Sequence, residues 1–343
     1  MTGSVSTTAG TVPQVSAELT FADRLGSIKA RWNIGRMNYK ADPGLYALGE
    51  PDDKAPVVVT ANYKMSFDAL RKALPGRNAW ILVLDTDGVN VWCAAGKGTF
   101  STGEVVKRVQ SSGLADVLSR RQLILPQLSA PGVAAHEVKK LSGFRVIYGP
   151  VRSRDLPSFI DSGYEATPQM RLKTFDIWER MVVIPVELVA ALKWALILLV
   201  LFFFAGGLGG SGGYWSRAVD HGLFTALALA TALVAGTILT PILLPWLPGR
   251  AFSMKGLILG LAAALILIIL RSPSLAHWSG RLEVLAWFFL IPAITAYLAM
   301  NFTGASTYTS LSGVKQEMRW AVPVEIATAC LGVILWIGSR MAA

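Results

Sequence analysis

The chain has 343 residues, which corresponds to about two domains at roughly 150 residues each. Charged residues make up 16%, against about 25% in ordinary soluble proteins, and the mean hydropathy is +0.48, so we do not expect a wholly soluble globular enzyme. The net charge is +10, and 40 of the 54 charged residues lie in the first 180. Two cysteines, Cys93 and Cys330, exclude a disulfide framework and an intrinsic four-thiolate zinc or iron–sulfur site, so any redox partner must be a separate protein.

The first 20 residues are rich in Ser and Thr and have neither a basic stretch nor an apolar core, so we expect no signal peptide. We assign residues 1–50 to a partly flexible N-terminal segment and residues 51–165 to an α/β domain. A juxtamembrane linker at 166–184 and a membrane domain at 185–343 follow.

The α/β domain is predicted from alternating strand and helix patterns. Short apolar runs at 57–60, 79–85, 89–92, 123–125 and 144–148 predict strands, and 67–73 and 133–141 predict helices. Asp87-Gly88 between two apolar runs indicates a hairpin. Ser101 and Glu104 form a capping-box pattern, so a helix begins there. These elements predict a small Rossmann-like domain with a mixed, mainly parallel sheet.

Ligands of such sheets bind at the carboxyl ends of the strands. Cys93 follows a predicted strand there, and a buried structural cysteine is its alternative interpretation. Small neighbours such as Gly96 leave room for a bulky ligand, Lys97 would favour the thiolate, and a thiolate suits a soft or transition metal. A phosphate-binding loop is excluded because its first glycine would fall on Val91. The candidate binding residues at these strand ends are Thr60, Asn90, Val91, Trp92, Cys93, Ala94, Ala95, Gly96, Lys97, Gln127, Gly132, Tyr148, Gly149 and Pro150.

Five apolar runs in the second half are long enough to span a bilayer, at 185–206, 223–244, 254–270, 282–300 and 321–337. Arg171, Lys173 and Arg180 precede the first run, so the positive-inside rule places the α/β domain in the cytoplasm and the C-terminus outside, in the cytoplasmic membrane. The polar connector 301–320 would then also be cytoplasmic, and we expect it to dock on the α/β domain or a partner. His136, His221 and His277 are isolated and predict surface or interface roles.

The segment Asn90-Val-Trp-Cys-Ala-Ala-Gly-Lys97 resembles the signature of the mercury-methylating corrinoid protein family (HgcA). Further similar segments are APGVAAHEV at 130–138, SGFRVIYGPVRSRDLPSF at 142–159 and NFTGASTYTSLSGVKQEMR at 301–319. The resemblance covers nearly the whole chain. It implies an N-terminal domain similar to the cobalamin-binding part of the corrinoid iron–sulfur protein of acetyl-CoA synthesis, followed by five membrane helices.

The resemblance also implies the chemistry. Cys93 matches the cysteine that binds cobalt on the lower face of a base-off, cobalamin-type corrinoid, and the methyl group goes from cobalt to Hg(II). It implies a ferredoxin-like reducing partner with two four-iron clusters (HgcB) and a folate-linked methyl donor. We also expect contact with membrane lipid and no binding of nucleic acid.

Two other functions fit the residues. One is a membrane-anchored corrinoid methyl carrier whose natural acceptor is not mercury. The other is a five-span transporter with a cytoplasmic sensor domain in which Cys93 captures a metal, which would require ionisable residues along a pathway inside the spans.

Overall fold

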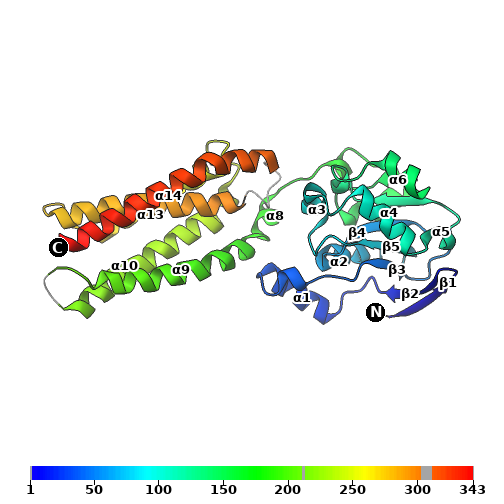
Figure 1. Cartoon of the computed structure of the whole chain (residues 1–343), viewed down its shortest axis with the longest axis horizontal. Coiled ribbons are helices and arrows are strands. Elements are labelled where there is room, and N and C mark those ends of the chain that lie inside the picture. Colours follow the sequence, from blue (N-terminus) through cyan, green and yellow to red (C-terminus); the bar gives the residue numbers. More distant parts are fainter. Residues whose placement is uncertain (1, 211–212, 303–310, 343) are drawn as a thin grey trace. The chain divides into compact units, whose positions relative to one another are not determined.

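The computed structural model describes residues 2–210, 213–302 and 311–342 (Figure 1). The chain divides into two compact units, Met1–Lys173 and Thr174–Ala343. The division falls inside the segment expected to be a linker, at 166–184. Each unit has its own buried core.

The first unit is built on a seven-stranded sheet in the order β1-β2-β3-β5-β4-β6-β7. Neighbouring strands β5, β4, β6 and β7 are parallel, β2 and β3 pair in parallel, and the β1–β2 and β3–β5 pairs are antiparallel. The mixed, mainly parallel sheet is therefore confirmed. The strands are β1 (Gly3–Thr7), β2 (Gly10–Val15), β3 (Gly44–Leu48), β4 (Val57–Ala61), β5 (Ala79–Leu84), β6 (Gln122–Leu125) and β7 (Arg145–Tyr148).

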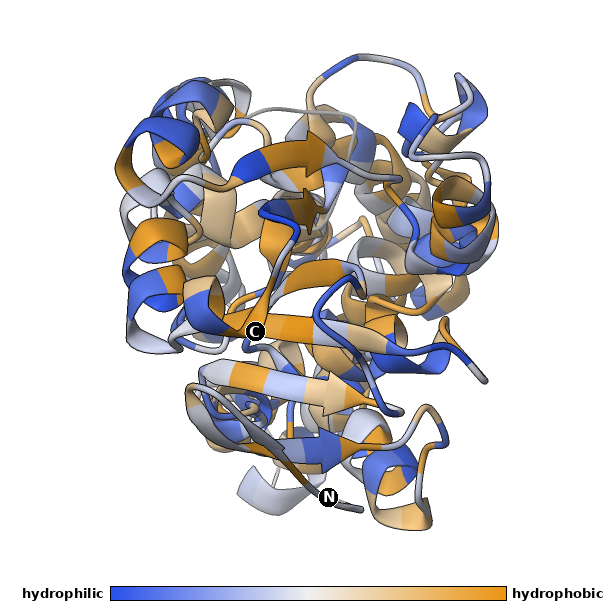
Figure 2. Cartoon of the chain, turned by 90° about the vertical axis from the view of Figure 1, so that its right-hand side faces the viewer, coloured by the Kyte–Doolittle hydropathy of each residue, from blue (hydrophilic) through white to orange (hydrophobic). Residues whose placement is uncertain are grey.

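Helices cover both faces of this sheet, and Figure 2 shows the most hydrophobic segments gathered in the strands between them. Successive residues of β4 and β5 alternate between two separate cores, as pleating requires. Helices α3 (Val91–Lys97), α4 (Thr102–Ser111), α5 (Leu114–Val117) and α6 (Ala135–Ser142) pack on one core, and α2 (Lys64–Lys72) and α7 (Leu156–Asp161) on the other. Helix α1 (Phe21–Arg31) and 3-10 turns at Arg36–Asn38, Gln127–Ser129, Ser153–Asp155 and Gln169–Arg171 complete the unit.

Two sequence-based expectations for this unit were wrong. The run 89–92 is not a hairpin strand, because the turn after β5 leads directly into helix α3, which Asn90 caps. Residues 1–50 do not lie apart from the domain, because they supply β1, β2 and β3 to the same sheet. β1 and β2 are short and partly polar, so they lack the apolar run used to find the others, whereas β3 (GLYAL) has such a run and was overlooked.

Five helices among the described residues of the second unit are long and apolar enough to cross a bilayer, as expected. They span Ile177–Gly206, Tyr214–Leu243, Phe252–Arg271, Trp278–Asn301 and Gly313–Met341. The first combines α8 (Ile177–Met181) and α9 (Ile184–Gly206), and the second joins α10 (Tyr214–Leu233), a π-helix at Val234–Leu239 and α11 (Thr240–Leu243). The others correspond to α12 (Phe252–Arg271), α13 (Trp278–Asn301) and α14 (Leu311–Met341).

The expected connector at 301–320 is shorter than the sequence suggested. Helix α14 already begins at Leu311, so Lys315 and Arg319 are helical. Residues 303–310, which include Gly304 and Ser306, lie outside the described part of the chain.

Candidate functional site

The candidate site lies at the carboxyl edge of the sheet. Strands β5, β4, β6 and β7 are adjacent and parallel, so their carboxyl ends meet at one edge. The segments predicted to bind a ligand follow three of these ends, at 90–97, 127–132 and 148–150. The topology therefore brings those three segments together, while their contact with a ligand stays a prediction.

Thr60 does not belong with the other candidates. Its side chain is buried, with 3% of its surface exposed. Its neighbours Val59 and Ala61 belong to the core beneath α3, so Thr60 points to the opposite face of the sheet. Thr60 is therefore a buried core residue of β4 in this structure, and the binding role expected of it stays a prediction.

The residue that organises this edge is Asn62, immediately after β4, and the sequence analysis missed it. Its Oδ1 accepts hydrogen bonds from Thr86 N (3.1 Å), Thr86 Oγ1 (2.8 Å) and Gly88 N (2.9 Å), and its Nδ2 donates to Asp85 Oδ1. The Val89 carbonyl lies 2.7 Å from the same Thr86 hydroxyl, whose single proton can be donated to either of these two acceptors. These bonds fold the chain back after β5 and determine where α3 begins. An Asn directly after a mostly apolar strand, VVVTA, was the available signal.

Helix α3 carries the cysteine. Asn90 is its N-cap, and Asn90 Oδ1 accepts a hydrogen bond from the backbone N–H of Cys93 at 2.9 Å. Cys93 is therefore in the first turn, and its side chain is half-buried and not in a disulfide. Within the described residues its sulfur has no hydrogen-bond partner. The thiol is thus positioned by a capped helix while remaining accessible.

The two sides of α3 differ in character. Ala94 and Ala95 are buried in the core, whereas Gly96 and Lys97 are exposed, and Val91 and Trp92 are half-buried. The helix ends at Gly98, whose φ of +83° lies in the left-handed region that favours glycine. Ala94, Ala95 and Gly96 after the cysteine are small, so the surface beside the thiol stays low as far as Lys97 at the end of the helix.

The loop after β6 is packed directly against α3. A Cβ on Gly132 would lie 2.2 Å from the Phe100 carbonyl oxygen and 3.1 Å from the Cα of Ala95, so only glycine fits there. The Gly132 carbonyl accepts a hydrogen bond from the N–H of Thr102, and Gln127 Oε1 accepts one from Arg171. Gly132 therefore sets the distance between the loop and the cysteine-bearing helix.

The end of β7 completes the edge. The Tyr148 hydroxyl donates to the carbonyl of Val133, and burial raises the pKa of Tyr148, so it remains a neutral donor. The Gly149 N–H donates to the Leu125 carbonyl at 2.8 Å, and both Gly149 and Pro150 are buried. These three candidates support the loops in this structure.

The described residues contain no cluster of three or more His, Cys, Asp or Glu side chains able to hold a metal ion. His136 is exposed on α6, and His221 and His277 lie in the second unit. Cys93 thus offers a single soft ligand. A single protein ligand fits a metal whose other coordination positions are occupied by the donor atoms of a macrocyclic cofactor.

The part of the chain that contains this edge is similar in sequence to known proteins. Residues 31–160 match a protein-family model described as CO dehydrogenase/acetyl-CoA synthase delta subunit. The chain is 33% identical over 125 residues to the gamma subunit of the acetyl-CoA decarbonylase/synthase complex of Methanopyrus kandleri, and 30% identical over 122 residues to that of Methanothermobacter thermautotrophicus. These matches cover 36% and 35% of this chain.

The chain spans about a quarter of the length of these relatives, 26% in each case. The family match extends from the end of α1 to α7 and contains the whole candidate edge, including Cys93. The expected likeness to a domain of the acetyl-CoA synthesis machinery is therefore supported. The five apolar helices lie outside the matched range.

Proposed function

We propose that the first unit holds a cobalt corrinoid at the carboxyl edge of its sheet, with Cys93 as the lower axial ligand of cobalt. The observation that carries the proposal is the accessible thiol on α3, within the region similar to subunits of a complex that makes and breaks acetyl-CoA. The absence of other metal ligands among the described residues around it fits a cofactor that supplies its own.

The residues around Cys93 fit a large planar group. Ala94, Ala95 and Gly96 follow the cysteine, and the exposed surface of α3 has no side chain at Gly96, so the first long side chain after the cysteine is Lys97 at the end of the helix. Val91 and Trp92, in the first turn of the helix, and Gln127, on the neighbouring loop, are half-buried at the same edge. We propose that these residues border the cofactor, while Gly132, Tyr148, Gly149 and Pro150 support them.

We further propose that the protein transfers a methyl group to Hg(II) and releases methylmercury. The corrinoid, when bound, would supply a methyl group carried on its metal. Cys93 would hold the metal and tune its electron density. An anionic sulfur donates more electron density to the metal than an imidazole would. That donation favours release of the methyl group, with its bonding pair, to a soft cation. The Asn90 cap and the Asn62 hydrogen bonds hold the sulfur in place.

The proposed cycle requires separate proteins. The described residues contain no group of three or more ligating side chains that could hold an iron–sulfur cluster. Electrons would come from a ferredoxin-like protein with two four-iron clusters, and methyl groups from a folate-linked donor. Five long apolar helices fit a multi-pass membrane protein. We propose that it lies in the cytoplasmic membrane with the first unit in the cytoplasm and the C-terminus outside.

The test compares Cys93→Ala, Cys93→His and Cys330→Ala. The last is the matched control, because Cys330 is the chain's other free cysteine and lies in the second unit. We expect Cys93→Ala to fold but lose mercury methylation, Cys93→His to retain corrinoid with low activity, and Cys330→Ala to resemble the wild type. Full methylation by Cys93→His would overturn the electronic role of the thiolate.

A corrinoid methyl carrier with another acceptor shares the same site, and it would bind corrinoid but transfer methyl to Hg(II) only slowly. The transporter alternative has one observation in its favour. A groove of about 460 Å³ between α9, α10, α13 and α14 is lined by Glu187 and Glu325, and Glu325 is 8% exposed with no hydrogen-bond partner for its carboxylate oxygens. An optical spectrum of the folded protein without a corrinoid band, together with metal transport into vesicles, would favour it.

A further inference from the structure

Helix α1 turns large apolar side chains outward and small or polar side chains toward the domain, which is the reverse of the usual arrangement in a surface helix. Its inward face carries Asp23, Gly26, Ser27 and Ala30, which are small or polar, and Ala30 is fully buried. Its outward face carries four large apolar side chains, Phe21 (79% exposed), Leu25 (39%), Ile28 (55%) and Trp32 (47%), which we call the apolar stripe. At 3.6 residues per turn these four positions lie on one side of the helix.

The apolar stripe is bordered by positive charge. The same helical geometry puts Lys29 on one side of it and Arg24 and Arg31 on the other. Residues 21–40 contain five basic residues but only one acid, Asp23. Beyond the helix, Ile34 and Met37 are also exposed, so the apolar surface continues into the following turn.

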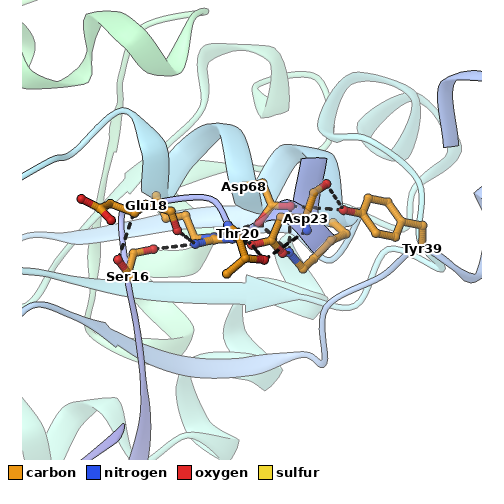
Figure 3. A network of polar contacts seen from close by, with 8 residues as sticks. Ser16, Glu18, Thr20, Asp23, Tyr39 and Asp68 are labelled. Atoms are coloured by element: carbon orange, nitrogen blue, oxygen red, sulfur yellow. Dashed lines mark hydrogen bonds and ion pairs between the residues drawn. The ribbon is translucent and has the colours of Figure 1, made fainter. Parts of the chain in front are cut away.

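This surface is held rigidly on the first unit (Figure 3). Asp23 accepts hydrogen bonds from Lys64 Nζ and Arg71 Nη2, both at 2.7 Å, and its backbone carbonyl accepts one from the Tyr39 hydroxyl. Thr20 and Asp23 form a capping box at the start of the helix. A Cβ on Gly26 would lie 2.5 Å from the Tyr39 ring, so the helix rests directly on that ring. Exposure of the apolar stripe is therefore a property of a fixed helix and not of a loose segment.

We propose that α1 is an interfacial helix that places its apolar stripe in the surface of a bilayer containing anionic lipid. An apolar face with a Trp, bordered by Lys and Arg, is the pattern of helices that lie in the plane of a membrane. The positive border complements anionic headgroups. The second unit provides five helices able to cross a bilayer, so the same chain keeps α1 within reach of lipid.

The proposal is independent of the chemistry at Cys93. A protein partner would need its own matching apolar groove, and nothing in the chain requires one. A bilayer surface that contains anionic lipid accepts both the four apolar side chains and the flanking positive charges, and it needs no specific shape to do so. The consequence is that the first unit would be oriented on the membrane and not only tethered to it.

The experiment uses the full chain in nanodiscs, with both native cysteines replaced by Ser and a single Ile28→Cys carrying an environment-sensitive fluorophore. We expect blue-shifted emission that is quenched by spin-labelled lipid when the disc contains phosphatidylglycerol. A label at Lys140→Cys on α6, which is exposed, is the control and should show neither effect. Adding Arg24→Glu and Lys29→Glu should reverse the shift at position 28, and phosphatidylcholine discs should weaken it.

Each other outcome contradicts the proposal. Blue-shifted emission at position 28 without quenching by spin-labelled lipid would show that α1 docks on protein, either the second unit or another copy. The label at position 28 could also emit like the control label and change only when a reducing partner is added. That result would assign the apolar stripe to the partner. Circular dichroism of the labelled protein would verify that each variant is folded.

Discussion

Single residues at the carboxyl edge fix the position of the Cys93 thiol. Asn90 caps its helix, Asn62 fixes the preceding turn, and Gly132 lets the neighbouring loop approach the helix backbone. The sequence pointed to Cys93 and its neighbours from their types and order. It did not reveal Asn62, because a hydrogen-bonding residue between a strand and a turn has no periodic pattern. It also did not show that Thr60 is buried, because both faces of β4 are covered by helices.

Gly132→Ala tests the role of close packing at this edge. The added methyl would overlap the Phe100 carbonyl, so the loop and α3 must separate, and we expect a loss of about 1–3 kcal/mol in the free energy of unfolding together with weaker corrinoid retention. The matched control is Gly103→Ala in α4, where the nearest other atom is 4.0 Å from the new Cβ. It should be neutral or stabilise the helix by up to about 1 kcal/mol. Denaturant titration of both variants checks this, and equal stability for the two would refute the packing argument.

At the scale of elements, most of the α/β pattern was predictable. The buried strands and α2, α4 and α6 follow from apolar runs and helical patterns, and the predicted helix start at Ser101 is confirmed. Helix α3 was misread because 89–92 is too short to distinguish helix from strand by its apolar residues, and Asp87-Gly88 favoured a hairpin. The capping residue Asn90 was the better signal. The start of α14 was misread because Ser312 and Gly313 in its first turn are residue types typical of loops.

The ion-pair network that fixes α1 predicts a pH dependence of stability. Burial acts to raise the pKa of Asp23, but hydrogen bonds from Lys64, the Thr20 backbone and Arg71 outweigh it and hold the pKa far below its ordinary value. A lowered folded-state pKa means that the stabilisation is fully present above the unfolded pKa of about 4 and is lost as the pH falls through the folded pKa.

Asp23→Asn should therefore destabilise the protein by about 1.5–3 kcal/mol at pH 7, because charged hydrogen bonds are lost. The difference from wild type should shrink steadily as the pH is lowered below about 4. Thermal unfolding of both proteins between pH 3 and pH 7 measures it. A difference that stays constant across this range would show that the carboxylate charge is not what stabilises α1.

At the scale of the whole molecule, the chain consists of two units of different composition, an α/β unit and a unit with five long apolar helices. The composition predicted this division, and the contacts place it after Lys173. All strands and the candidate edge lie in the first unit, whereas the five apolar helices lie in the second. The two functions of binding and membrane attachment should therefore be separable.

A fragment of residues 1–173 should fold and bind corrinoid without the membrane helices. The reason is that both faces of its sheet are already covered by helices from the same unit. Gel filtration and circular dichroism would verify folding, and reconstitution with corrinoid followed by an optical spectrum would measure binding. A folded fragment that never acquires cobalt would show that the second unit supplies part of the binding surface.

The central claim is that the Cys93 sulfur binds the cobalt of a corrinoid, and X-ray absorption at the cobalt edge of the reconstituted protein tests it most directly. The account predicts a sulfur neighbour of cobalt in the wild type and in Cys330→Ala, and only lighter neighbours in Cys93→Ala and Cys93→His. Cobalt without a sulfur neighbour in the wild type, or with one that persists in Cys93→Ala, would contradict it.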